Sequence, residues 1–184
     1  MESFRPTRGG GVRATLAPAE ASLLRSLVGQ VISLIAPDGA PPGPPGGPLD
    51  WDAELDEMDQ PHTTPDDPVL ARLLPDGYRD DPTAAEEFRK YTESGLRSAK
   101  QQAAQEMLDT LPEAGGKIRL THDQAHAWLK ALNDVRLALG VRLGVTEEFE
   151  EQWGRLKPDD PQWSAFEVYA WLGAVQESLV QAMK

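Results

Sequence analysis

The chain has 184 residues, 40% of them hydrophobic, which is enough to build the core of one domain. It has no cysteine, which excludes disulfides, thiolate metal sites and thiol nucleophiles. There is no apolar run of about eighteen residues, which a membrane span would need. Arg5 and Arg8 are not followed by the apolar stretch of a signal peptide, since no such stretch begins before Leu23. We therefore expect no membrane span, no signal peptide and a cytoplasmic location.

The charge is strongly acidic but unevenly placed. The net charge is −12, from 30 acidic and 18 basic residues. Nucleic-acid binding gains most of its affinity from Lys and Arg on phosphates, so this charge predicts weak DNA binding at most. Nine of the acids lie between Pro37 and Asp67, where there is no Lys or Arg. The rest of the chain is nearly neutral, and we expect it to lack a basic stripe.

The N-terminal third predicts a turn, a strand, a helix and a loop. Glycines 9–11 indicate a turn or a flexible arm, and residues 12–16 alternate apolar and polar as a strand does. A helix with one apolar face begins at Pro18 and is stopped by Pro37. Residues 37–67 are rich in Pro, Gly and acids, which predicts a long disordered loop. It is either a spacer or a segment that competes with an anionic partner for Arg5, Arg8 and Arg13.

The remainder predicts four further helical segments, a second strand and a last helix. In chain order these are helices over 68–74 and 83–111, a strand at 117–120, and helices over 121–143, 146–156 and from Asp160-Pro161 to Met183. Phe88, Thr92, Leu96 and Ala99 begin the expected inner face of the 83–111 helix. The predicted fold is mainly α: one domain over 1–184, a bundle of about four to six helices with a two-strand β element.

Several polar residues are candidates for a functional site. Arg89, Glu93 and Arg97 are spaced four apart on one helix face, which makes a ladder of alternating charge. Asn133 and Arg136 lie among apolar neighbours in the 121–143 helix, where buried polar groups need partners. These five residues form either a network that ties helices together or a notch for a partner.

The last helix carries a second apolar strip. Val168, Trp171 and Val175 lie on a different side from Phe166 and Leu172. This strip is either additional core or an interface, for example that of a homodimer.

Motifs for catalysis, metals and cofactors are missing. His122 and His126 are one helical turn apart, but the residue between them is Asp123 rather than the glutamate of a metalloprotease helix, and the only other histidine lies in the loop. No Gly-Lys-Ser or Gly-Lys-Thr follows glycines 9–11, and no serine lies in a Gly-x-Ser-x-Gly turn. We expect no metal site, no cofactor and no enzymatic activity.

Four segments together resemble a known family. They are Leu70–Arg79 (LARLLPDGYR), Glu87–Arg89, the central-helix motif Leu132–Gly144 (LNDVRLALGVRLG), and Tyr169–Gly173 (YAWLG). They resemble the actinobacterial domain-of-unknown-function family 2017, whose members are also named AosR, for oxidative-stress transcriptional regulator. The similarity spans nearly the whole chain from Phe4-Arg5 onward, but not the loop at 37–67.

The resemblance implies a cytoplasmic regulator, often encoded beside the adaptor of the Clp protease, and brings no catalytic residues. Redox sensing by a cysteine pair is associated with the family, and this chain departs from that pattern because it has no cysteine. One hypothesis is a transcription-associated regulator that contacts proteins such as polymerase or a sigma factor. The alternative is an adaptor or accessory factor in Clp-type proteolysis. Because there is no cysteine, the four methionines or a partner would have to sense oxidant if the protein responds to it.

Overall fold

The computed structural model describes residues 2–36, 64–78, 80–157 and 159–184. In chain order the elements are β1 (Glu2–Pro6), β2 (Val12–Leu16), α1 (Pro18–Ile35), α3 (Pro68–Leu73), α4 (Pro82–Thr110), β3 (Gly116–Leu120), α5 (His122–Leu143), α6 (Phe149–Arg155) and α7 (Trp163–Ala182). The mainly α prediction is confirmed, with six helices among the described residues. The predicted loop lies outside the described residues as far as residue 63.

The three strands form one antiparallel sheet in the order β1-β2-β3. The predicted pair of strands is therefore correct, but β1 is an addition, because a five-residue strand with Phe4 as its one large apolar side chain gives too short an alternation to recognise. Glycines 9–11 lie in the turn of the β1–β2 hairpin. Gly10 has a φ of +79°, and Thr7 donates its N–H to the Gly11 carbonyl at 2.8 Å.

Side-chain caps explain where the helices begin. Asp67 accepts from the N–H groups of Val69 and Leu70 at 2.7 and 3.0 Å, so the last residue of the predicted loop is the N-cap of α3. Asp81 caps α4 through the N–H of Ala84 at 3.0 Å. Thr121 and Gln124 form the predicted capping box of α5, which ends at Gly144 in the left-handed conformation.

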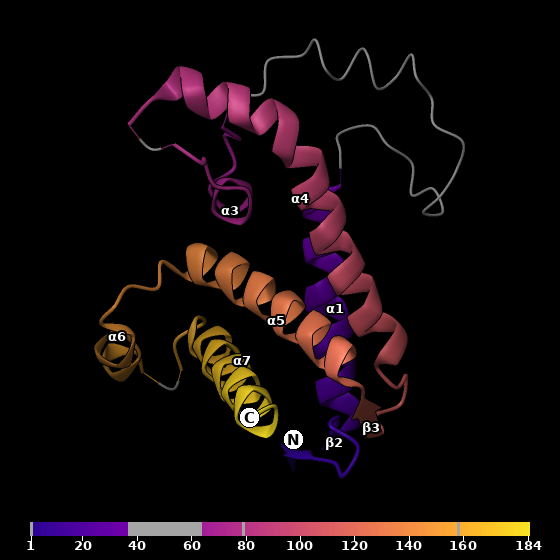
Figure 1. Ribbon diagram of the computed structural model, residues 1–184. Coiled ribbons are helices and arrows are strands. Elements are labelled where there is room, and N and C mark those ends of the chain that lie inside the picture. Colours follow the sequence, from indigo (N-terminus) through magenta and orange to yellow (C-terminus); the bar gives the residue numbers. More distant parts are fainter. Residues whose placement is uncertain (1, 37–63, 79, 158) are drawn as a thin grey trace.

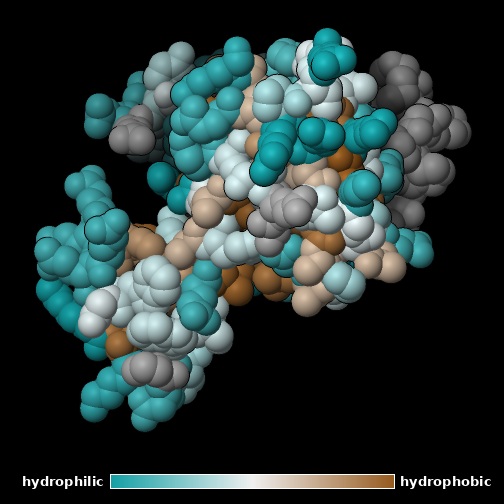
Figure 2. Space-filling model, turned by 90° about the horizontal axis from the view of Figure 1, so that it is seen from below, coloured by the Kyte–Doolittle hydropathy of each residue, from teal (hydrophilic) through white to brown (hydrophobic). Residues whose placement is uncertain are grey.

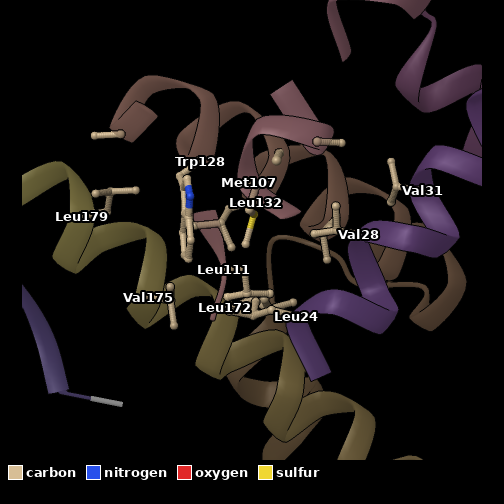
Figure 3. Packing of buried hydrophobic residues seen from close by; sticks show 14 of the residues in the cluster. Leu24, Val28, Val31, Met107, Leu111, Trp128, Leu132, Leu172, Val175 and Leu179 are labelled. Carbon is tan, nitrogen blue, oxygen red and sulfur yellow. The ribbon is translucent and has the colours of Figure 1, made fainter. Parts of the chain in front are cut away.

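Helix α5 lies between α7 on one side and α1 with α4 on the other (Figure 1). Trp128 of α5 is fully buried and donates its indole N–H to the Thr110 hydroxyl at 2.7 Å. Phe4 of β1 packs edge-on against this indole with a centroid distance of 5.9 Å. Figure 3 shows Val175 and Leu179 of α7 on one side of Trp128, and Leu24 and Val28 of α1 beyond Met107.

None of the described helices is long and apolar enough to cross a membrane.

Candidate functional site

The inner face of helix α4 differs between its two halves, being apolar in the C-terminal half and charged in the N-terminal half. From Ala103 onward its buried side chains are apolar, as a bundle helix requires. In the N-terminal half, the inner face instead carries Arg89, which is 5% exposed, and the half-buried Glu93 and Arg97. We call these three residues the charge ladder.

The charge ladder is continuous at hydrogen-bond distance. Arg89 Nη1 lies 2.6 Å from Glu93 Oε2, and Arg97 Nη2 lies 2.6 Å from Glu93 Oε1. Arg89 Nη2 also contacts Asp76 Oδ1 at 2.5 Å and the Leu74 carbonyl at 2.9 Å. One guanidinium therefore joins α4 to the segment that follows α3.

The ladder also holds the two described chain ends that flank residues 37–63. Arg97 donates from Nη1 to the carbonyl of Ile35, the last residue of α1, at 2.9 Å. On the other side Thr64 donates its hydroxyl to Asp76 Oδ2 at 2.7 Å, and Asp76 is the partner of Arg89. The sequence spacing predicted the ladder, but its contacts with Ile35 and Asp76 come from tertiary structure.

The ion pairs keep the carboxylates of this region charged. Burial on its own would raise the pKa of Glu93, but hydrogen bonds and charges from Arg89 and Arg97 outweigh it, so this pKa is lowered. The hydrogen bond from Arg89, followed by that from Thr64, lowers the pKa of Asp76. Both carboxylates are therefore ionised at neutral pH and neutralise Arg89.

The outer face of the same half of α4 is apolar. Phe88, Tyr91 and Leu96 are 46%, 68% and 39% exposed, and Tyr78 in the preceding turn is 52% exposed. Tyr78 and Phe88 pack edge to face with a centroid distance of 5.8 Å. We call these four residues the outer stripe. They are the exposed large hydrophobic residues of the described part of the chain.

Gly77 explains how Tyr78 and Phe88 can meet. A Cβ atom at this position would lie 2.6 Å from the Phe88 ring, so any larger residue would push the ring away. The sequence prediction placed Phe88, Leu96 and Ala99 on the inner face of α4, and that prediction is wrong. Each step along a helix rotates by about 100°, so burying Arg89 turns Phe88 toward solvent.

The other predicted site residues do not join the ladder. Asn133 is exposed, contrary to the prediction, because α5 turns its neighbour Asp134 inward instead. Arg136 donates from Nη1 to Gln176 Oε1 at 2.7 Å and lies 5.2 Å from the Tyr169 ring centre, so it connects α5 to α7. Among the described residues, Arg136 makes no hydrogen bond or ion pair with Arg89, Glu93 or Arg97.

The apolar strip predicted on α7 is not an open surface. Val175 is 2% exposed and belongs to the core, while Val168 and Trp171 are half-buried and pack against it. The strip is therefore largely additional core, one of the two predicted alternatives, and an interface there stays a prediction.

The sequence reading missed the buried pair of Asp134 and Lys100. Lys100 Nζ donates to Asp134 Oδ1 at 2.6 Å and joins α4 to α5. Burial raises the pKa of Asp134 above its ordinary value, and Lys100 offsets only part of that effect. The sequence could not single out Asp134, since Asn133 and Asp134 are adjacent polar residues and only packing selects the buried one.

Asp134 predicts a distinctive pH dependence of stability. A raised pKa means that the folded state binds the proton more tightly, so this stabilisation is greatest at low pH and is lost as the pH rises through the folded pKa. Asp134→Asn should therefore gain stability relative to the wild type between pH 4 and pH 7. Glu93→Gln should lose stability relative to the wild type at lower pH, as the pH rises from the lowered folded pKa of Glu93 to the ordinary value of 4.5, and should change little above it. Midpoints of thermal unfolding at four pH values test this, and equal signs for the two variants would contradict it.

Among the described residues, the histidine pair has no third ligand nearby. His122 and His126 are exposed, with a ring-centroid distance of 4.4 Å, and His126 Nδ1 lies 2.9 Å from the His122 carbonyl. Across the part of the chain that the structure describes, no three His, Asp or Glu side chains are grouped as metal ligands.

Fold and surface together define a helical bundle with a small sheet and a solvent-facing apolar stripe on α4. The chain belongs to the family described as a domain of unknown function (DUF2017), whose model matches residues 1–183. Proteins named oxidative stress regulator AosR, from Mycobacterium tuberculosis and Mycobacterium bovis, are 41% identical over 94% of this chain and 82% of their own length. A putative oxidative stress regulator AosR from Mycobacterium leprae is 36% identical over 95% of this chain and 83% of its own. No solved structure matches.

The family assignment predicted from sequence is thus confirmed, while the missing cysteine sets a limit on redox chemistry. Thiol-specific oxidation with diamide should leave helicity, electrophoretic migration and partner binding unchanged, because there is no thiol to oxidise. Of the methionines, Met107 is fully buried and Met183 half-buried, and Met1 and Met58 lie outside the described residues. A reversible change with diamide, monitored by circular dichroism and non-reducing electrophoresis, would contradict this prediction.

Proposed function

We propose that this protein is a non-enzymatic, cytoplasmic regulator of the oxidative-stress response that acts on transcription through protein contacts. The outer stripe of α4 is the observation that carries the proposal. The names of the relatives support the stress response, and the stripe supports contact with a protein. The partner class that we propose is RNA polymerase or a sigma factor.

The stripe fits a protein contact because its apolar side chains cannot turn into the core. The buried Arg89 and its partners Glu93 and Asp76 fix the rotation of α4 about its axis. Fully burying one large apolar side chain is worth about 1.5–3 kcal/mol, so three aromatic rings and a leucine can anchor a partner. Tyr and Phe are also enriched in interface centres.

Two hollows in the described part of the surface offer little support for catalysis. The crevice between α1 and α5, lined by residues such as Leu27, Val31 and Val135, has a volume of about 20 Å³, room for about one water molecule. A shallow depression beside it, over Ser26 and Ser33, has Arg142 as its one ionisable side chain. Neither offers the paired acid and base that most catalysis needs.

The alternative role as a Clp adaptor rests on the genomic neighbourhood of the family and on the apolar strip at Val168, Trp171 and Val175. The strip gives it little support, because these residues belong to the core or pack against it. No contact among the described residues favours it over the transcription role.

An electrophoretic mobility-shift experiment tests the proposed function. Promoter DNA is titrated with the protein alone, with polymerase holoenzyme alone, and with both. We expect a supershifted complex only when polymerase is present, and weak, diffuse binding by the protein alone. Nanomolar, salt-sensitive binding by the protein alone, or no effect on the polymerase complex, would overturn a mechanism based on protein contacts.

A further inference from the structure

The solvent face of the three-stranded sheet is cationic. Arg5 of β1 is directly opposite Arg13 of β2, and Arg13 is directly opposite Arg119 of β3. Two residue pairs further along, Lys117 is opposite Thr15. Residues that are directly opposite one another point to the same side of a sheet, so these cations share one face. All four are exposed, and we call them the cationic face.

The opposite side of the same sheet packs on the core. Val12, Ala14 and Leu16 of β2 and Ile118 and Leu120 of β3 are buried, so the alternation fixes the cations outward. Figure 2 looks at the molecule from the end at which the strands lie in Figure 1, and hydrophilic side chains gather over the sheet. The sequence reading expected no basic stripe, and the sheet corrects it by joining Arg119 to residues more than a hundred positions earlier.

The face has more cations than acids. None of the four cations takes part in an ion pair among the described residues, and Glu2 of β1, paired with Thr15, is the one acidic residue of the three strands. Like charges directly opposite each other destabilise a sheet. A row of three arginines at cross-strand separations of about 5 Å is therefore an arrangement that an external anion would stabilise.

We propose that the cationic face binds the phosphate backbone of duplex DNA. Arg, Lys and Thr are side chains that contact phosphates without reading bases. The described side chains of this face include no aromatic ring, so it cannot stack unpaired bases as single-strand binders do. It also has no exposed apolar anchor of the kind that protein interfaces need, which favours nucleic acid over an acidic protein.

The binding is weak and independent of sequence. With about four phosphate contacts, the logarithm of the association constant should fall with the logarithm of salt concentration with a slope of about −3.6. Affinity should then drop about a hundredfold between 50 and 200 mM salt. The net charge of −12 opposes the contact further. The inference goes beyond the protein contact at the outer stripe, since it concerns a different surface and a different class of partner.

Fluorescence anisotropy of a labelled non-promoter duplex of about 30 base pairs tests the proposal with the full chain. Arg13→Gln and Arg119→Gln should each reduce the salt slope by about one, and the double variant should halve it. Arg72→Gln is the matched control, because it makes the same charge change at an exposed position of α3, away from the sheet in Figure 1. Since the substituted residues are exposed, the circular dichroism spectra should be unchanged. Arg13→Gln should unfold at a slightly higher temperature in low salt, because it removes the repulsion between Arg13 and the two arginines opposite it.

Three results would overturn the proposal. One is no salt-dependent binding of the duplex at 25 mM salt, and another is an equal loss of affinity in Arg72→Gln. The third is displacement of the duplex by polyglutamate at equal charge concentration, which would assign the face to acidic proteins. The polymerase experiment is unaffected by these outcomes, so failure here leaves the contact at the outer stripe intact.

Discussion

Replacing Arg89 by methionine is expected to lower the free energy of unfolding by about 3 kcal/mol. The guanidinium is buried and contacts two carboxylates and the Leu74 carbonyl, so its removal leaves several groups without their partner. Breaking a buried ion pair costs about 3–5 kcal/mol. We expect the lower end, because the Asp76 side chain is 29% exposed and can be rehydrated.

Urea unfolding followed by circular dichroism measures this loss, and the chain supplies its own control. Arg155 and Glu151 of α6 form another Arg–Glu pair four residues apart, at 3.1 Å, but both side chains are largely exposed. Arg155→Met should therefore cost less than about 1 kcal/mol. Converting Asp76 and Glu93 to their amides in the Arg89→Met background should recover part of the stability. Equal losses for Arg89→Met and Arg155→Met would show that burial of the ladder has no energetic role.

Helix positions could be predicted from the sequence because their signals are local. The capping box of Thr121 and Gln124, the caps at Asp67 and Asp81, and Gly144 act within a few residues of themselves. Helix α7 begins at Trp163, about two residues later than predicted, because Asp160 forms a turn by accepting from the N–H groups of Gln162 and Trp163. The prediction mistook the Asp-Pro pair for the cap itself.

The orientation of α4 could not be predicted in the same way. Its sequence contains an apolar row through Phe88 and Leu96 beside a charged row through Arg89 and Glu93, about 100° away. Periodicity identifies both rows but does not say which one faces the core. Asp76 and the carbonyls of Leu74 and Ile35 decide the question by receiving the guanidinium groups, and these partners come from other segments.

The cationic face depends even more on tertiary structure. Outside residues 37–67 the charges along the chain nearly cancel. The sequence shows only the sequence neighbours of Arg119, such as Lys117 and Leu120. Antiparallel pairing places Arg119 opposite Arg13 and so creates a charge row that no window of sequence contains. The same limit applies to Asn133 and Asp134, since adjacent helix positions differ by about 100° and only packing selects the buried one.

The two surfaces lie at opposite ends of α4. The outer stripe is near its N-terminal end, while its C-terminal end leads into β3 of the sheet (Figure 1). A helix rises 1.5 Å per residue, so Tyr91 lies about 28 Å along the axis from Thr110. A partner at the stripe can therefore hold the sheet close to DNA without either ligand covering the other. Such tethering raises the effective concentration of a weak contact.

Replacing Phe88 and Tyr91 together by serine is expected to weaken binding to RNA polymerase holoenzyme by about a hundredfold or more. Central aromatic anchors cost about 2 kcal/mol or more each when truncated, and about 1.4 kcal/mol corresponds to a tenfold change in affinity. The two effects will not simply add, because both rings lie on one face of α4. Folding should change little, since the side chains are 46% and 68% exposed.

Biolayer interferometry with immobilised holoenzyme measures the change, and a conservative variant supplies the control. Phe88→Tyr with Tyr91→Phe keeps both rings, so it should bind within about threefold of the wild type if buried aromatic area is what matters. The salt dependence separates this contact from the cationic face, because an apolar contact weakens little as ionic strength rises. Wild-type affinity in the serine variant, with an unchanged unfolding midpoint, would assign the protein contact to another part of the surface.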